Sequence, residues 1–154
     1  PASGLLPFLG DRHQATAGLT LRPNAHMVWE NTYIHSDLIR QASEGGGLVF
    51  DNHILRSKVN YFFTREFSLR FILDYSTVRP DQALIDLERT KRLGVDVLLT
   101  YLLHPGTALY LGYTDLKENW ALDPTRTPST WRTDEANRLV GRQFYFKLSY
   151  LFRP

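Results

Sequence analysis

Five histidines carry the most versatile side-chain chemistry in this chain, because an imidazole can bind a metal ion or transfer a proton near neutral pH. They are His13, His26, His35, His53 and His104, and they are dispersed along the sequence. None forms a His-x-x-x-His pair or a His-Glu-x-x-His run, the spacings that bring two imidazoles to one face of a helix. The sequence therefore predicts no metal site.

Other residues with ligand or phosphate chemistry also lack the neighbours that this chemistry needs. The glycine run at 45–47 is not followed by the Lys-Ser/Thr of a phosphate-binding loop. The acidic residues Asp81, Asp86 and Glu88 do not have the spacing of an EF-hand calcium loop. We therefore expect no cofactor and no enzyme activity here; any activity of the gene product would lie in a separate N-terminal domain.

Composition sets broad limits on the fold and on the partners. With 154 residues, 43% hydrophobic and 22% charged, the chain is long and apolar enough for one folded domain. Its 18 basic and 16 acidic residues are mixed, and the net charge is +2, so nucleic acid is not an expected partner. Cysteine is absent, which excludes a disulfide framework and a thiolate metal site.

The sequence contains no run of about twenty apolar residues, so no segment is expected to cross a membrane as a helix. It starts with Pro1-Ala2-Ser3-Gly4, without an initiator Met or an apolar leader. We expect that the beginning of the gene product is missing.

A period of two dominates the chain and predicts strands, because successive side chains on a strand point to opposite faces. In 143–152 every even residue is large and apolar, and most odd residues are polar. In 67–75 five large apolar residues alternate with Ser, Arg, Ile and Asp. The same pattern predicts seven strands, over or around 14–22, 27–33, 55–63, 67–75, 93–103, 107–113 and 143–152. A short helix is expected at 81–89.

The connections between these strands alternate between short and long. The short ones are Pro23-Asn24, Thr64-Arg65-Glu66 and Pro105-Gly106; the long ones contain the glycine run, 81–89 and 116–138. Outer-membrane barrels have short periplasmic turns and long external loops. The pattern therefore predicts an antiparallel transmembrane β-barrel segment in a bacterial outer membrane, with residues 1–13 as an N-terminal extension or external loop. Because such barrels have an even number of strands, we expect at least one further strand, before Pro1 or from another chain.

Charged residues are confined to one side of the predicted strands. The proposed lumen-facing charges are Arg56, Lys58, Arg70, Asp74, Asp96 and Lys147. A charge against lipid at the membrane midplane costs about 2–4 kcal/mol for Arg or Lys, so this confinement supports the assignment of faces. Two roles are open: a cross-strand ladder of opposite charges, or the lining of a selective pore. Apolar residues on the same side favour a partly filled or plugged lumen.

Three segments of the chain resemble the C-terminal region of the DUF5916 family. They are 56–70, 99–113 and 144–152, and the turn Pro105-Gly106-Thr107-Ala108-Leu109-Tyr110 is the most specific of the matching pieces. The resemblance implies a bacterial envelope protein whose strand-rich barrel follows an N-terminal module similar to family-9 carbohydrate-binding modules. No residue of this chain matches that sugar-binding module.

The last strand also resembles the signal that the barrel-insertion machinery reads, through Phe146, Leu148, Tyr150 and Phe152. The same alternation is found in any amphipathic edge strand, and Arg153-Pro154 extends past the expected terminal aromatic residue. We therefore expect the wall or anchor of a porin-like transport, export or surface-display protein of the Gram-negative envelope, in contact with outer-membrane lipid and with other envelope chains. The alternative is a soluble β-sheet domain, a sandwich or lipocalin-like barrel, that binds a ligand or a partner protein.

Overall fold

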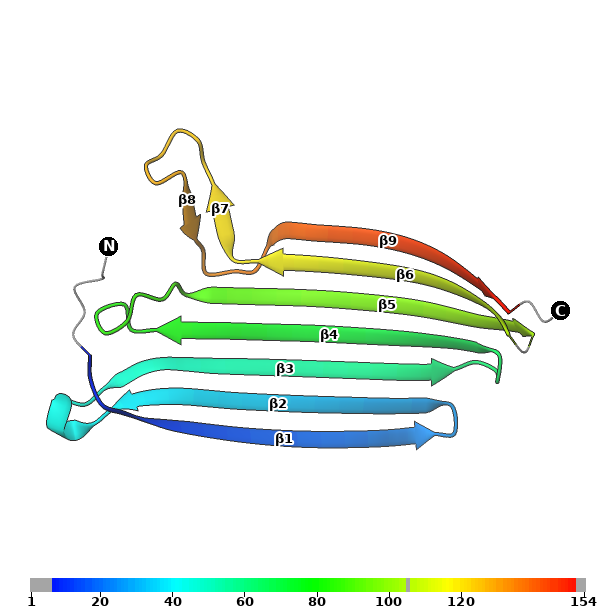
Figure 1. Ribbon diagram of the computed structural model, residues 1–154, viewed down its shortest axis with the longest axis horizontal. Coiled ribbons are helices and arrows are strands. Elements are labelled where there is room, and N and C mark those ends of the chain that lie inside the picture. Colours follow the sequence, from blue (N-terminus) through cyan, green and yellow to red (C-terminus); the bar gives the residue numbers. More distant parts are fainter. Residues whose placement is uncertain (1–6, 105, 152–154) are drawn as a thin grey trace.

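The computed structural model describes residues 7–104 and 106–151, and nearly all of its regular structure is β-strand (Figure 1). One short 3-10 helix, η1 (Ala42–Glu44), lies in the loop that contains the glycine run. The strands are β1 (Gly10–Asn24), β2 (Met27–Arg40), β3 (Leu48–Phe62), β4 (Phe67–Pro80), β5 (Thr90–His104), β6 (Thr107–Glu118), β7 (Trp120–Leu122), β8 (Thr130–Arg132) and β9 (Arg138–Tyr150).

Seven of these strands form one antiparallel sheet in the order β1-β2-β3-β4-β5-β6-β9. Each strand lies beside its neighbour in the chain, except that the hairpin β7–β8 is inserted between β6 and β9. The predicted all-β antiparallel fold with seven main strands is confirmed. The sheet is open: in the described part of the chain, β1 pairs only with β2 and β9 pairs only with β6.

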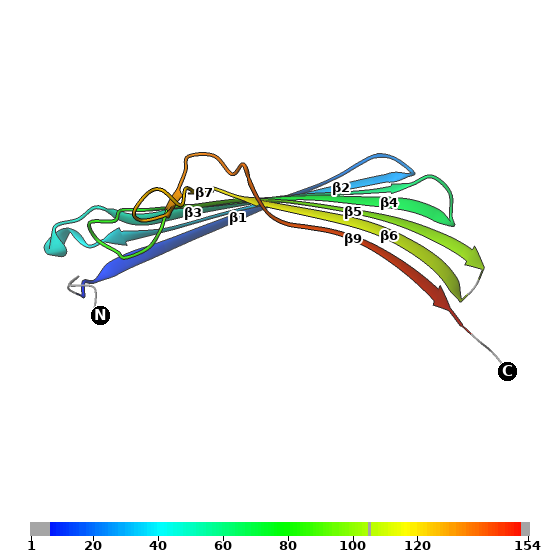
Figure 2. The ribbon, with the colours of Figure 1, turned by 90° about the horizontal axis from the view of Figure 1, so that it is seen from above.

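The sheet is a single twisted layer, as the view along it shows (Figure 2). Its described residues bury only two apolar side chains, Val49 and Ala108, whereas many large apolar side chains are exposed. Burial of apolar surface is the main favourable term in folding, and a soluble domain obtains it by packing two or more layers together. Within the described residues, this chain has no such second layer.

The strands extend beyond the segments that the alternating pattern predicts. Strand β1 begins at Gly10 and therefore includes part of the expected N-terminal extension, and β3 begins at Leu48, seven residues before the expected start at Leu55. The sequence does not alternate near these ends: Asp11-Arg12-His13 is polar on both faces, and Leu48-Val49-Phe50 is apolar on both faces. Backbone pairing with the adjacent strand holds these residues in the sheet despite the missing pattern.

The prediction of a helix at 81–89 is wrong. The amides of Leu84 and Ile85 donate to the carbonyl of Asp81 over 3.0 and 3.1 Å, and the Asp81 carboxylate accepts from the amide of Ala83. This Asx-type turn satisfies the local backbone in one turn, after which the chain runs without regular structure to Thr90. The partial apolar stripe in this segment is too short to nucleate a helix.

Gly112 of β6 has a packing role on the polar face of the sheet. A β-carbon built on it would lie 1.9 Å from the Cε1 atom of Tyr145 on β9, because the tyrosine ring covers the glycine. Such a glycine–aromatic contact fixes the register of neighbouring strands. Gly141, also on β9, has open space in the corresponding position.

We predict that Gly112→Val weakens the pairing of β6 with β9, since the tyrosine ring must leave its place. The expected loss in the free energy of unfolding is about 1–3 kcal/mol, measured by urea titration. Gly141→Val serves as the matched control and should cost less. Equal losses in the two variants would show that the Tyr145 contact does not contribute.

Candidate functional site

One face of the sheet is apolar across all seven strands. Paired residues of antiparallel strands point to the same side, so the register can be followed from strand to strand. One row across the sheet is formed by Leu21, Trp29, Val59, Phe71, Val97, Tyr113 and Phe144. The stripes predicted separately on each strand therefore form a single continuous surface, which we call the apolar band.

Aromatic side chains lie at both ends of the apolar band. Near the short turns, the ring of Phe67 lies 4.8 Å from that of Phe63 and 6.1 Å from that of Tyr101, centre to centre. Near the long loops, Tyr33 and Tyr75 occupy one register row, both opposite Leu55. Aromatic rings at the two limits of an apolar surface are typical of membrane–water interfaces, where the apolar body and the polar tip of the side chain meet different surroundings.

The opposite face carries the six charges that the sequence assigned to one side. The register places all six, Arg56, Lys58, Arg70, Asp74, Asp96 and Lys147, on this polar face. The face also carries apolar side chains, among them Ile72 and Leu98. The polar face therefore carries both charged and apolar side chains.

Several of these charges form a cross-strand ladder. The guanidinium of Arg56 donates to both carboxylate oxygens of Asp74, over 2.6 and 2.9 Å. Lys58 pairs with Glu30 over 2.5 Å, which the sequence did not identify as its partner. The hydroxyl of Thr114 donates to Asp96 over 2.6 Å. Exposed pairs of this kind stabilise by about 0–1 kcal/mol each, so they fix register more than they add stability.

The two remaining charges of the set lie away from this ladder. The ammonium of Lys147 lies 5.8 Å from the ring centre of Tyr110, a cation–π contact across β6 and β9. Arg70 lies opposite Asn60 and Leu98, and it forms no ion pair with the other described residues.

The residues of the expected insertion signal lie on the apolar band at the outer edge of the sheet. Phe146, Leu148 and Tyr150 of β9 are 68%, 58% and 69% exposed. Phe152, the fourth residue of that signal, and Pro105 of the predicted third turn lie outside the described residues.

The fold brings together three of the histidines that are dispersed in the sequence. At the long-loop end of the apolar band, His13 contacts Asp37 over 3.1 Å, and His35 lies 3.4 Å from the same carboxylate. His53 stacks on His35, with ring centres 4.7 Å apart. This histidine cluster lies on β1, β2 and β3, directly beyond the apolar side chains.

A sequence signal for the histidine cluster existed. Each of three successive strands carries a histidine two residues from an aspartate, at 11–13, 35–37 and 51–53. The period of two places the members of each pair on one face, and the antiparallel register aligns the three strands. Within residues 7–104 and 106–151, however, no group of three or more potential ligands has a geometry that holds a metal ion.

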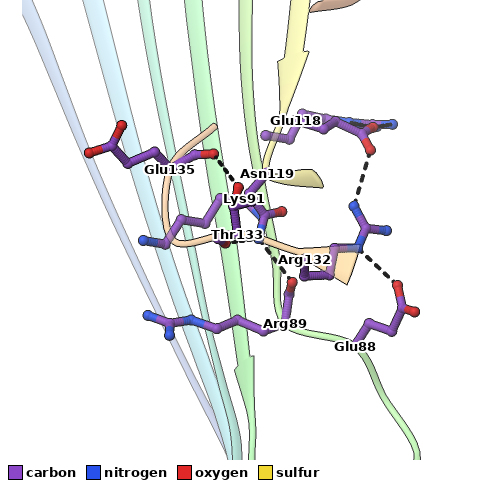
Figure 3. A network of polar contacts seen from close by, with 9 residues as sticks. Glu88, Arg89, Lys91, Glu118, Asn119, Arg132, Thr133 and Glu135 are labelled. Atoms are coloured by element: carbon purple, nitrogen blue, oxygen red, sulfur yellow. Dashed lines mark hydrogen bonds and ion pairs between the residues drawn. The ribbon is translucent and has the colours of Figure 1, made fainter. Parts of the chain in front are cut away.

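A buried asparagine joins the two long loops next to the hairpin (Figure 3). Asn119 follows β6 and is completely buried. Its side-chain amide donates to the carbonyls of Arg89 and Thr133 over 3.1 and 2.8 Å, and its side-chain oxygen accepts from the amide of Lys91 over 2.6 Å. These bonds fix the segment before β5 against the segment after β8.

An arginine between two glutamates extends this network (Figure 3). Arg132 of β8 pairs with Glu88 over 2.9 Å and with Glu118 over 3.4 Å. The hydrogen bond that Arg132 donates to Glu88 is the largest cause of the raised pKa of Arg132. A cleft of about 370 Å³ opens beside this arginine, lined by Glu88, Glu118, Trp120, Thr130, Trp131, Arg132 and Val140. None of the lining residues other than Glu88 was singled out from the sequence, because the cleft depends on a hairpin that the alternating pattern does not reveal.

Comparisons with known proteins give no relatives for this chain. No family model, curated protein sequence or solved structure matches it. In the part of the chain that the structure describes, no helix has the length and hydrophobicity needed to span a membrane.

Proposed function

We propose that this chain is the wall of a β-barrel in a bacterial outer membrane, with the apolar band against lipid and the polar face toward the lumen. It would anchor a transport, export or surface-display protein. The proposal is carried by one observation: the apolar band crosses the register rows at the angle expected for tilted strands in a membrane.

The position of the band shifts toward the short turns from β1 to β9, on average by one residue per strand. On β1 the apolar stripe 15–21 is centred on Gly18. The register connects Gly18 through Thr32 and Arg56 to Asp74 on β4, but the stripe 67–75 is centred on Phe71, three residues nearer the short turns. Three steps between strands thus move the band by three residues.

The shift continues at the same rate across the other half of the sheet. The same row reaches Gly94 on β5, Leu116 on β6 and Gly141 on β9. The stripes 93–103, 109–113 and 144–150 are centred on positions 98, 111 and 147, which are four, five and six residues farther toward the short turns. The band therefore shifts by one residue per strand.

This shift gives the angle between the strands and the normal to the band. A rise of about 3.3 Å per residue and a strand spacing of about 4.8 Å correspond to a tilt of roughly 35°. Strands in outer-membrane barrels are tilted by about 35–45°. A flat slab of hydrocarbon that crosses tilted strands produces a band with this diagonal course.

The height of the band also fits the proposal. From Phe67 to Tyr75 it spans nine residues of β4, and transmembrane strands need about 9–11 residues at this tilt. A single-layer sheet with this much exposed apolar surface requires a cover, and lipid is a cover of the right thickness.

The two edges determine how such a wall would close. β1 and β9 both run from the long-loop end to the short-turn end, because they are the first and last of seven alternating strands. They would meet in parallel if they paired with each other. An antiparallel barrel therefore needs an odd number of additional strands between them, from this gene product or from another chain.

Gel migration and extraction test the proposal against the soluble alternative. A barrel in detergent is expected to migrate differently before and after heating, and to stay in the membrane after a salt wash. Release by salt without detergent, with no heat-dependent migration, would favour the soluble β-sheet domain. The similarity to the DUF5916 region and the nature of the cargo remain predictions.

A further inference from the structure

Basic side chains follow the edge of the apolar band that lies nearest the long loops. On each of β4, β5, β6 and β9, a cation lies within the strand and on the same face as the apolar stripe, between the stripe and the long loops. The first cations beyond the stripe are Arg79, Lys91, Lys117 and Arg142. We call these four residues the basic line.

The basic line also runs diagonally across the sheet, but more steeply than the band: it shifts by two residues per strand and the band by one. Along the strands, Arg79 lies two residues beyond the row that contains Lys91. Lys117 lies two residues nearer the short turns than Lys91, and Arg142 lies two residues nearer still. Adjacent members are therefore on adjacent strands and two residues apart along the strand direction. With strands about 4.8 Å apart and two residues spanning about 6.6 Å along a strand, their Cα atoms are roughly 8 Å apart. Two such flexible side chains can therefore reach the same phosphorylated headgroup.

The charge of this part of the surface is positive. The carboxylate on the same face of these four strands near the line is Asp115, which accepts from Arg142 over 3.1 Å. Asp51 of β3 lies opposite Arg79 in the register. Lys91 donates to the backbone carbonyl of Asp134, which does not neutralise its charge. Four cations thus lie beside two carboxylates, Asp115 and the Asp51 of the adjacent strand β3, so the net charge along the line is positive. The same edge on β1 to β3 carries the histidine cluster with its aspartates.

We propose that the basic line binds the phosphate groups of lipid headgroups at the long-loop side of the membrane. This inference rests on the proposed function, since it requires the apolar band to lie in lipid. Each member of the line lies two to four residues past the last apolar residue of its stripe. It lies on the same face as the band, which the proposed function places against lipid. Cations near an anionic lipid surface are attracted over distances of about a Debye length, and phosphate accepts several hydrogen bonds from Lys and Arg.

The test measures association of the full chain with vesicles of phosphatidylcholine, alone or mixed with the anionic lipid phosphatidylglycerol. The wild-type chain is expected to bind the mixed vesicles more strongly, and the preference should fall as salt rises. The double variant Lys91→Gln, Lys117→Gln should lower the preference by about ten-fold or more, while it still inserts into phosphatidylcholine. The matched control Arg70→Gln, Lys147→Gln removes two charges from the polar face and should keep the wild-type preference.

The outcomes separate this inference from the proposed function. Equal binding of both kinds of vesicle, or an equal loss of preference in both double variants, would overturn the basic line alone. Failure to insert into either kind of vesicle would overturn the outer-membrane proposal and the basic line with it. Added inorganic phosphate at constant ionic strength should leave the preference in place; if it abolishes the preference, the cations hold a free anion and not a lipid headgroup.

Discussion

Phe71→Arg is expected to make insertion less favourable by about 2–4 kcal/mol, the cost of a basic side chain on the lipid face near the midplane. Phe71 is the central one of the five apolar residues that β4 contributes to the apolar band, so the substitution places the charge in the middle of the hydrocarbon layer, far from both interfaces. The measurement is the yield and urea midpoint of insertion into phosphatidylcholine vesicles.

Arg70→Phe provides the control one residue away. Arg70 points to the polar face, so its replacement removes a charge without placing one in lipid. We expect a loss of under about 1 kcal/mol, as for a surface substitution. Similar losses in the two variants would remove the assignment of the faces.

Asn119→Ala is expected to have the second large effect, on the loops and not on insertion. The substitution leaves the amide of Lys91 and the carbonyls of Arg89 and Thr133 without their side-chain partner. Each buried polar group without a partner costs about 1–3 kcal/mol, although water that enters the site recovers part of the loss. We expect local opening to become easier by about 3 kcal/mol, which corresponds to a roughly hundred-fold faster amide exchange at Lys91 and Thr133.

Asn137→Ala is the matched control for this prediction, since Asn137 is exposed in the same long connection. Its exchange rates should stay as in the wild type. Unchanged exchange at Lys91 in the Asn119 variant, or equal acceleration in the two variants, would show that the buried asparagine does not hold the loops together.

The central parts of the strands could be predicted from the sequence because one face there is apolar and the other is mostly polar. β4 is the clearest case: Phe67, Leu69, Phe71, Leu73 and Tyr75 alternate with shorter or charged residues. The strand ends could not be predicted, because the alternation disappears there: the start of β1 is polar on both faces, and the start of β3 is apolar on both. Residues such as Asp11 and His13 belong to β1 only through pairing with β2.

The parts of the candidate site that depend on contacts between distant residues were harder to predict. The charges of the polar face were identified, but the pairing of Lys58 with Glu30 requires the register of β2 against β3. Helical spacings do not reveal the histidine cluster, because strands bring residues together at a spacing of two. Asn119 carries no local signal, since its partners come from two other segments.

The most direct test of the sidedness uses Leu98 and Leu99, two neighbouring residues of β5 with the same side chain on opposite faces. Since the chain contains no cysteine, Leu98→Cys and Leu99→Cys each give a single site for a fluorescent label. In vesicles with brominated acyl chains, the label at position 99 is predicted to be strongly quenched and the label at position 98 weakly quenched. Equal quenching at both positions, or stronger quenching at position 98, would contradict the proposal that the apolar band faces lipid.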